Sequence, residues 1–374
     1  MTPVEATALA RVLVQAAGRQ PRVSPNPAVG CAIVRGERVV ATGVTEPPPG
    51  RHAEVVALTG AGDAARGATA VVTLEPCAHH GRTPPCTEAL AAAGIARVVL
   101  ALADPNPVAT GGAVRLRAAG IEVVGPLPAT DPLPGSVARS LEGFLHVVRT
   151  GRPHLTLKLA QTVDGATVHP EGQRWLTGPA ARAAVHRLRA AVDGVLVGSG
   201  TVLADDPGLD VRHVAADHQP RVVVLDARLR TPVTARVVRP GSVVVTVTAP
   251  PGGDRAAVAT HAAVGRRLEA AGVTLVAVPP GLDGGVDLPA ALTALAERGM
   301  VSLLAEPGPT LSGALLAAGL VDRLVRHVAV HLGGGADRTL RVPPPGTGWC
   351  LERSGGAGTD AIVSYHRTTG DPAP

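Results

Sequence analysis

The residues best suited to chemistry lie in the stretch from Thr73 to Cys86 and at His52, upstream of it. Cys77 and Cys86 each follow a proline, at a point where a helix would begin. A helix N-terminus carries partial positive charge, which lowers the pKa of a cysteine and favours the thiolate that binds metals. One histidine and two cysteines form the ligand set of a catalytic zinc that keeps its fourth position open for water. The sequence therefore predicts a zinc site made of His52, Cys77 and Cys86.

Glu54 stands two residues after His52, where it would reach a zinc-bound water without taking a coordination place. A His-x-Glu followed by Pro-Cys and a second cysteine is typical of zinc-dependent nucleobase deaminases, in which the glutamate carries protons. Eight residues separate the two cysteines here, whereas that pattern has two. A structural zinc with His79 or His80 as the fourth ligand is the alternative, but it gives Glu54 no role. Glu75 is expected to be an acidic residue in the first turn of a helix.

Length, charge and aromatic content limit the classes of protein to which the chain can belong. Its 374 residues favour two domains over a single core. The formal charge of +5 indicates an anionic partner, which could be RNA, a sugar phosphate or a phosphorylated cofactor. Because only 1% of the residues are aromatic, the chain lacks platforms for stacking unpaired bases, so we expect no nucleic-acid partner. We also expect no membrane partner and a cytoplasmic location, since no apolar run reaches spanning length and no signal-peptide pattern opens the chain.

Helix and strand patterns alternate along the first part of the chain. Helices are expected over 5–18, 52–60, 87–94 and 113–120, and strands over 28–34, 39–43, 70–74, 98–101 and 121–124. This alternation predicts a three-layer α/β sandwich with a largely parallel sheet, and it places the zinc residues at strand carboxyl ends and helix N-termini. A proline-rich stretch over 125–135 indicates a domain boundary. We therefore divide the chain into domains of residues 1–148 and 149–374.

The alternation restarts in the second part. Strands are expected over 155–159, 194–198, 221–225, 242–246, 273–278, 301–305, 324–330 and 360–366, and helices over 136–149, 178–190, 256–271, 289–298 and 310–318. A glycine-bearing loop, 308–313, opens the last helix, and its free N–H groups could cradle a phosphate, although such a loop is also an ordinary turn. Asp205 and Asp206 could bind ribose hydroxyls or cap a turn. Lys158 is the one lysine among 35 basic side chains.

The two sets of motifs together resemble, over nearly the whole chain, the bifunctional deaminase-reductase family of riboflavin biosynthesis. The zinc stretch and Asp104-Pro-Asn106-Pro look like the deaminase half, and the eight-residue cysteine spacing belongs to that family. Val-Leu-Ala-Asp205-Asp206-Pro with Arg212 looks like the reductase half. The resemblance implies an N-terminal cytidine-deaminase-like α/β/α sandwich and a C-terminal dihydrofolate-reductase-like α/β domain.

For the first domain, the resemblance implies hydrolysis of the 2-amino group of 2,5-diamino-6-(5-phosphoribosylamino)pyrimidin-4-one. Zinc would activate the attacking water, and Glu54 would act as the catalytic proton carrier. The positions that match substrate-contacting residues of the family are Asn26, His79, Arg82, Asp104 and Asn106.

For the second domain, the resemblance implies that NADPH reduces the ribosyl group, which gives 5-amino-6-(5-phosphoribitylamino)uracil. Lys158 would be catalytic, because its compact ammonium is not replaced by a planar guanidinium. The cofactor positions are Ala160, Trp175, Thr201, Asp205, Gly308, Pro309, Thr310, Leu311, Ser312, Gly313 and Ala314. The substrate positions are Gln173, Arg189, Leu209, Arg212 and Glu306. We expect the small phosphorylated pyrimidine to be the partner, and the enzyme to be a homo-oligomer.

Three other interpretations compete with this one. The positive charge would suit a tRNA or nucleoside deaminase with an accessory domain, but the scarcity of aromatic residues and the second set of motifs oppose it. A zinc-stabilised interaction protein would make no use of Glu54. A deaminase with a degenerate reductase domain would explain why Gln173 and Pro307 depart from the family pattern.

Overall fold

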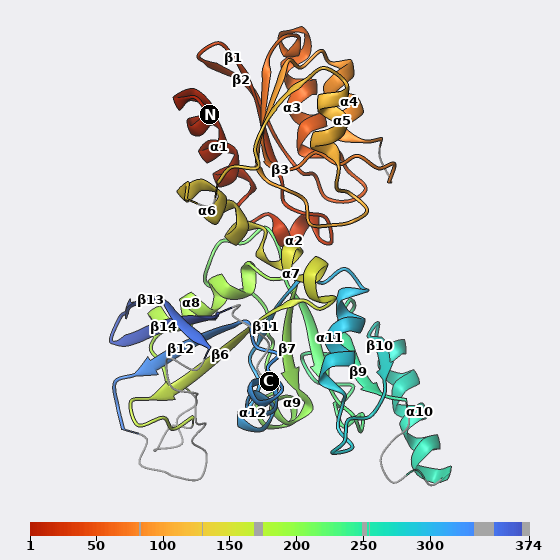
Figure 1. Cartoon of the computed structure of the whole chain (residues 1–374). Coiled ribbons are helices and arrows are strands. Elements are labelled where there is room, and N and C mark those ends of the chain that lie inside the picture. The colour runs from red at the N-terminus through yellow and green to blue at the C-terminus, as the bar shows by residue number, and fades with distance from the viewer. Residues whose placement is uncertain are drawn as a thin grey trace. The chain divides into compact units, whose positions relative to one another are not determined.

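The computed structural model describes residues 1–81, 84–128, 130–167, 175–248, 253, 255–332 and 348–368. The chain forms two compact units, Met1–Gly151 and Arg152–Pro374, each built around its own sheet (Figure 1). Within the described ranges, no helix is both long and apolar enough to cross a membrane.

The first unit contains a five-stranded sheet in the order β2-β1-β3-β4-β5. Its strands are β1 (Gly30–Arg35), β2 (Arg38–Val44), β3 (Thr69–Leu74), β4 (Arg97–Leu102) and β5 (Glu122–Val124). Strand β1 is antiparallel to both β2 and β3, whereas β3, β4 and β5 are parallel. The expectation of a largely parallel sheet is therefore wrong, because the tight turn between β1 and β2 makes a hairpin and β1 then pairs with β3 in the opposite direction.

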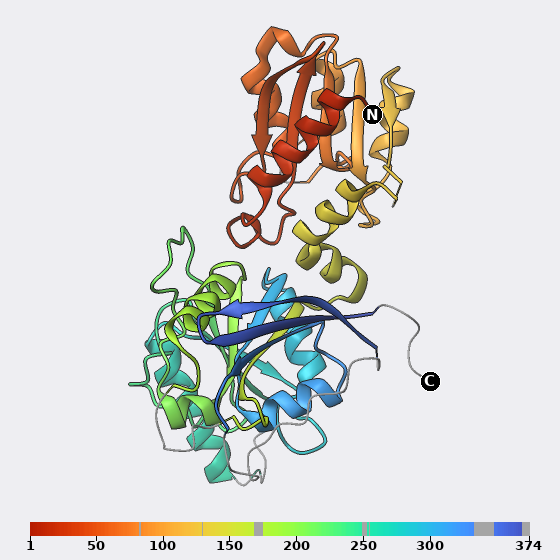
Figure 2. The ribbon, with the colours of Figure 1, turned by 90° about the vertical axis from the view of Figure 1, so that its left-hand side faces the viewer.

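Helices cover both faces of this sheet. They are α1 (Pro3–Ala16), α2 (Gln20–Val23), α3 (Ala53–Ala61), α4 (Cys86–Ala92), α5 (Gly112–Ala118), α6 (Pro132–Ser140) and α7 (Glu142–Thr150). Helix α1 lies across one face, as Figure 2 shows, and α3, α4 and α5 cover the other (Figure 1). The single helix expected over 136–149 is two helices, because Leu141 leaves the helical conformation with its side chain fully buried.

The second unit contains a nine-stranded sheet in the order β10-β9-β8-β7-β11-β6-β12-β14-β13. Its strands are β6 (His154–Thr162), β7 (Gly194–Gly198), β8 (Arg221–Leu225), β9 (Val243–Val247), β10 (Thr274–Val278), β11 (Ser302–Ala305), β12 (Arg323–Ala329), β13 (Trp349–Ala357) and β14 (Asp360–Arg367). In this order, every strand from β10 through β12 pairs with its neighbour in parallel. Strand β14 pairs antiparallel with both β12 and β13. Parallel strands bring their carboxyl ends to one edge of the sheet, which is where ligands bind in α/β folds.

The helices of the second unit connect these strands. They are α8 (Pro179–Ala190), α9 (Ser199–Asp205), α10 (Arg255–Ala270), α11 (Leu288–Ala296) and α12 (Pro309–Ala317). Helix α9 was not predicted, because seven residues that include Gly200 are too short to show a helical repeat. It nevertheless matters for the site, because it carries two of the expected cofactor positions.

Candidate active sites

The three expected zinc ligands meet in the first unit. His52 directly precedes α3, Cys77 follows β3, and Cys86 is the first residue of α4. Their ligand atoms lie within 4.8 Å of one another. His52 Nδ1 is 3.2 Å from the Cys86 sulfur and 3.6 Å from the Cys77 sulfur. One nitrogen and two sulfurs at these separations fit a tetrahedral zinc whose fourth position is open, so the donor set suits a catalytic metal.

The surroundings of Cys77 favour its thiolate. A hydrogen bond from the Cys86 thiol, together with the contact from His52, lowers the pKa of Cys77 despite its burial, and the same hydrogen bond raises the pKa of Cys86. The backbone N–H of Cys86 also donates to the Cys77 sulfur, at 3.4 Å. This N–H belongs to the first turn of α4, so the start of α4 acts on the Cys77 thiolate. The expectation that Cys77 itself stands at the start of a helix is wrong, because Cys77 lies in a loop after β3.

Glu54 lies in the first turn of α3, one residue beyond the start of the helix that His52 precedes. Its side chain is buried, and this burial raises the pKa of the Glu54 carboxyl. A carboxyl with a raised pKa can take up a proton and release it again near neutral pH, which is what a general acid and base must do.

A cavity of about 290 Å³ opens over Glu54 and two of the zinc residues, His52 and Cys77. Four of the expected substrate positions line it: Asn26, His79, Asp104 and Asn106. Asp104 and Asn106 come from the loop after β4, where Asp104 accepts the N–H of Asn106 at 2.9 Å. Burial raises the pKa of Asp104. The fifth expected position, Arg82, lies outside the described residues.

Two residues that the sequence did not assign to the site hold its loops. Glu75 is not in a helix, contrary to expectation, because β3 ends at Leu74 and the chain continues as a loop. Its carboxylate accepts the N–H of Asp104 at 3.2 Å and that of Ala113 at 2.8 Å. It therefore ties the loop of Cys77 to the loop after β4 and to the start of α5.

Gln20 has the corresponding role for the loop that carries Asn26. Its amide nitrogen donates to the backbone oxygen of Asn26 at 2.9 Å, and its amide oxygen accepts the N–H of Ala28 at 3.0 Å. The side chain is buried. Nothing in the sequence distinguished Gln20 from a surface residue, because its partners are backbone groups six and eight positions away.

In the second unit, a buried ion pair marks the other expected site. Arg189 from α8 donates to Glu306, which follows β11, through two hydrogen bonds of 2.6 and 3.1 Å. Burial raises the pKa of Glu306, but Arg189 and Lys158 outweigh this effect and lower it overall. Lys158 lies on β6, and burial lowers the pKa of its ammonium. The structure thus brings together one carboxylate and two cations at the carboxyl end of β11, beside the middle of β6.

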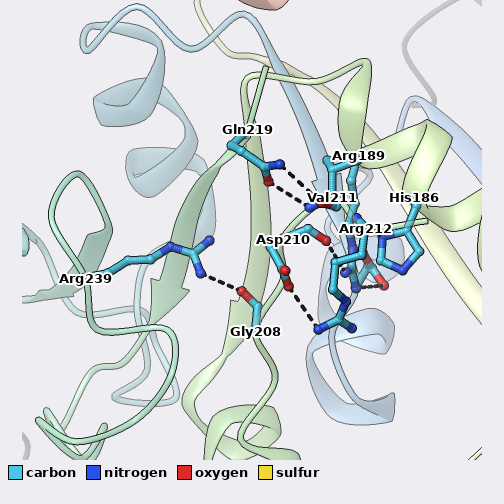
Figure 3. Close-up of polar contacts among 9 residues, drawn as sticks. His186, Arg189, Gly208, Asp210, Val211, Arg212, Gln219 and Arg239 are labelled. Atoms are coloured by element: carbon cyan, nitrogen blue, oxygen red, sulfur yellow. Dashed lines mark hydrogen bonds and ion pairs between the residues drawn. The ribbon is translucent and has the colours of Figure 1, made fainter. Parts of the chain in front are cut away.

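Arg212 and Leu209 lie in the irregular segment that follows α9. Leu209 is buried and has a positive φ of 51°. The guanidinium of Arg212 is 3.3 Å from the Asp210 carboxylate, and its side chain is 40% exposed. Figure 3 shows this segment beside Arg189, which donates to the backbone oxygen of Asp210 at 3.0 Å. Gln173, another expected substrate position, is outside the described residues.

Thr201 and the expected cofactor positions from Gly308 to Ala314 lie at the starts of α9 and α12, whereas Ala160 lies on β6 and Trp175 precedes α8. The hydroxyl of Thr201 accepts the N–H of Gly308 at 3.1 Å, which joins the two helices. Gly308 has no side chain to cap α12, so the first-turn N–H groups are open to a phosphate, and Pro309, Thr310, Leu311, Ser312, Gly313 and Ala314 form that part of the helix. Asp205 ends α9, while Asp206 caps a turn by accepting the N–H of Arg236 at 2.8 Å.

Two further residues of the second unit belong to this description. Trp175 is half exposed, and the guanidinium of Arg182 lies 5.1 Å from the centre of its ring.

His327, on β12, pairs in register with Ala160 on β6, so the two side chains share a face of the sheet. His327 is fully buried, and both of its ring nitrogens are without hydrogen-bond partners in the described part of the chain. Burial, and then the charge of Lys158, lowers the pKa of His327 to about 4.

Two family models match successive parts of the chain. The RibD C-terminal domain matches residues 153–350, which is more than half of the chain. The cytidine and deoxycytidylate deaminase zinc-binding region matches residues 4–102. The riboflavin biosynthesis protein RibD of Escherichia coli is 42% identical over 343 residues, which cover 90% of each chain.

The chain belongs to the RibD family. RibD of Mycobacterium tuberculosis is 40% identical over 316 residues, 83% of this chain and 80% of that protein. The solved structure of Acinetobacter baumannii RibD has a TM-score of 0.82 and 34% identity, and covers 98% of this chain and 99% of its own. A diaminohydroxyphosphoribosylaminopyrimidine deaminase/5-amino-6-(5-phosphoribosylamino)uracil reductase of Thermotoga maritima has a TM-score of 0.80 and 29% identity, with coverage of 97% and 99%.

As a member of the RibD family, the chain is a bifunctional deaminase and reductase of riboflavin biosynthesis. Its first half is a zinc-binding deaminase domain, and its second half is an NADPH-using reductase domain. The expected family, the two-domain α/β fold, the pair of activities and both cofactors are confirmed.

Proposed function

We propose that residues 1–148 deaminate 2,5-diamino-6-(5-phosphoribosylamino)pyrimidin-4-one, and that residues 149–374 reduce the ribosyl group of the product. The relative from Thermotoga maritima carries the names of both of these activities. The observation that carries the proposal is the cavity of about 290 Å³, in which Glu54, His52 and Cys77 face amide, imidazole and carboxyl groups suited to the edge of a pyrimidine.

The deaminase reaction follows from the positions of the side chains. His52, Cys77 and Cys86 would hold the zinc, which would supply the Lewis acid that makes water a nucleophile near neutral pH. Glu54 takes the proton that the attacking water releases and gives it to the departing amino nitrogen, so that ammonia leaves. Asn26, His79, Asp104 and Asn106 hold the ring in the cavity, with Arg82 predicted to join them.

The reductase reaction uses the polar cluster of the second unit. NADPH, when bound, would supply the hydride that C1′ of the ribosyl group takes up. Lys158, whose pKa is lowered by burial, gives a proton to the ring oxygen as the C1′–oxygen bond breaks, which leaves the open ribityl chain. Glu306 and Arg189 hold the substrate side of the site, together with Leu209, Arg212 and, as predicted, Gln173. Ala160, Trp175, Thr201, Asp205 and the start of α12 would hold the cofactor.

Two statements about the whole protein belong to the same proposal. We place the enzyme in the cytoplasm, because the two cysteine ligands must stay reduced to bind zinc as thiolates. We also expect a homo-oligomer whose partners are copies of this chain, with no nucleic acid bound. Sedimentation at several protein concentrations tests the oligomer, and retention on immobilised RNA at moderate salt would contradict the second expectation.

The decisive experiment is a coupled assay with zinc-loaded protein. Diaminopyrimidine ribosyl phosphate is added first, and released ammonia is measured. NADPH is added next, and its oxidation is followed. Ammonia release followed by NADPH oxidation is the expected result. Ammonia release without NADPH oxidation would leave a deaminase with a degenerate reductase domain, and no ammonia from this substrate would overturn the proposed deaminase reaction.

A further inference from the structure

The segment from Gly208 to Arg212 has no regular secondary structure, and side chains from elsewhere in the second unit hold its backbone (Figure 3). Arg239 donates to the backbone oxygen of Gly208 at 2.8 Å, and Arg189 donates to that of Asp210 at 3.0 Å. A backbone without strand or helix partners must be fixed by such contacts if it is to hold one conformation.

The side chain of Gln219 binds both backbone groups of Val211. Its amide oxygen accepts the N–H of Val211 at 2.8 Å, and its amide nitrogen donates to the oxygen of Val211 at 3.2 Å. Figure 3 shows both ends of the Gln219 amide facing Val211. One side chain therefore satisfies both backbone groups of the residue directly before Arg212, as a neighbouring strand would.

His186 holds the next peptide. Its Nδ1 accepts the N–H of Arg212 at 3.0 Å, and its ring meets that of His213 edge-on, with centres 5.4 Å apart. Accepting this bond requires Nδ1 to carry no proton. Burial, and then the charges of Arg189 and Arg212, lowers the pKa of His186, which keeps the imidazole neutral. His186 lies on α8, three residues before Arg189, so one helix contributes two of the contacts.

The two arginines at this place are not equivalent. Arg189 is largely buried, and its guanidinium is bound by the Glu306 carboxylate and the oxygen of Asp210. Arg212 has one ion contact, of 3.3 Å, among the residues that the structure describes, and its side chain is 40% exposed. Arg212 is thus the cation that can turn to an incoming anion, and an arginine fork matches the oxygens of a phosphate.

We infer that His186 and Gln219 are positioning residues, which fix the peptides on either side of Val211 so that Arg212 is held ready for the phosphate of the substrate. The inference rests on the proposed reductase function. A backbone that is already fixed loses less conformational entropy when the Arg212 side chain binds the phosphate, so the two residues act on substrate affinity and not on the chemical step.

The test compares the reductase reaction of phosphorylated and dephosphorylated substrates. For His186→Leu, which cannot accept the N–H of Arg212, we expect KM for 5-amino-6-(5-phosphoribosylamino)uracil to rise about tenfold, with kcat within about twofold of wild type. The same compound without its phosphate should react equally with the variant and the wild type. His186→Asn, whose side-chain oxygen can accept the same N–H, should restore KM.

Gln219→Met gives the second, independent measurement. Methionine has a similar volume to glutamine but makes neither of the two hydrogen bonds of the Gln219 amide with Val211. This variant should also raise KM for the phosphorylated substrate and leave the reaction of the substrate without phosphate unchanged. Binding of ribose 5-phosphate, measured by calorimetry, should weaken in parallel in His186→Leu and Gln219→Met. Tryptophan emission, which comes from the second unit alone, shows that this unit is folded in each variant, and the deaminase activity of the same chain shows that the first unit is intact.

Two results would overturn the inference. One is an equal loss for both forms of the substrate, which would indicate general loosening of the site; the other is an unchanged KM in both variants. Failure of the proposed function is distinguishable, because the wild-type protein itself would then neither oxidise NADPH nor bind ribose 5-phosphate.

Discussion

The Glu75 carboxylate accepts the backbone N–H of Asp104, and this contact couples the loop that carries Cys77 to the loop that lines the far side of the cavity. The other carboxylate oxygen accepts the N–H of Ala113, at the start of α5. Both contacts are largely shielded from water. Glu75 also lines the cavity, so it joins the zinc-bearing loop, the loop after β4 and the substrate cavity through one side chain.

Glu75→Gln is expected to impair the deaminase. The amide offers one acceptor in place of two, and its NH2 group faces a backbone N–H, so one buried donor loses its partner at a cost of about 1–3 kcal/mol. We expect kcat/KM for ammonia release to fall at least about tenfold, while NADPH oxidation on the deaminated substrate is unchanged. Glu122→Gln is the matched control, because Glu122 is exposed on β5 and pairs with Arg97. Equal effects of the two substitutions would contradict the role of Glu75.

Glu54→Gln is expected to stop deamination while leaving the metal in place. The amide keeps the size of the side chain but cannot carry a proton, and loss of a general acid and base costs about 10²–10⁴ in rate. The measurements are ammonia release and zinc content of the purified variant. A rate near that of the wild type, with zinc retained, would refute the role of Glu54 and favour a structural zinc.

Lys158→Arg is expected to cut reductase turnover strongly and to leave deamination intact. A guanidinium is bulkier than an ammonium, and its pKa is too high for it to give up a proton near neutral pH. Single-turnover NADPH oxidation on the deaminated substrate provides the measurement, and ammonia release from the same preparation is the internal control. Unchanged reductase turnover would show that a cation is sufficient at this position.

His327 is expected to make the second unit sensitive to acid. Its pKa is about 4 in the folded protein, against 6.5 for an ordinary histidine. Between these values the unfolded chain binds the extra proton, so stability is complete above pH 6.5 and is lost as the pH falls toward 4. The loss at pH 4 amounts to ~3 kcal/mol.

Replacement of His327 tests this dependence directly. Urea unfolding of His327→Leu should show a smaller fall in stability between neutral and acidic pH than the wild type, and no loss at neutral pH, because no unpaired nitrogen remains buried. His366→Leu, on the exposed part of β14, should keep the dependence of the wild type. An unchanged pH dependence in His327→Leu would contradict the buried neutral imidazole.

Much of the fold could be predicted because most elements have a plain repeat of apolar residues. Strand β3 is a continuous apolar run, and α1 shows one apolar face, so both lie close to their expected ranges. Strand pairing could not be read in the same way, because the antiparallel pairing of β1 with β3 joins residues about forty positions apart. Local composition carries no information on such a pairing.

The same distinction applies to the sites. His52, Glu54 and Cys77 could be predicted because zinc chemistry demands particular residue types at particular spacings. Glu75 and Gln219 bind backbone groups, which every residue type except proline offers. The sequence therefore could not predict which residues these two side chains would contact. Their roles became visible only when the folded chain brought Asp104 and Val211 beside them.

The two tryptophans of the chain, Trp175 and Trp349, both lie in the second unit, and so does its one tyrosine, Tyr365. Near-ultraviolet absorption and indole emission of the protein therefore come from the reductase half, and the deaminase half is optically silent apart from Phe144. A melt followed by emission would report on one half alone, whereas circular dichroism of the peptide bonds reports on both. Coincidence of the two curves would mean that the halves unfold as one cooperative unit, and divergence would give the stability of each.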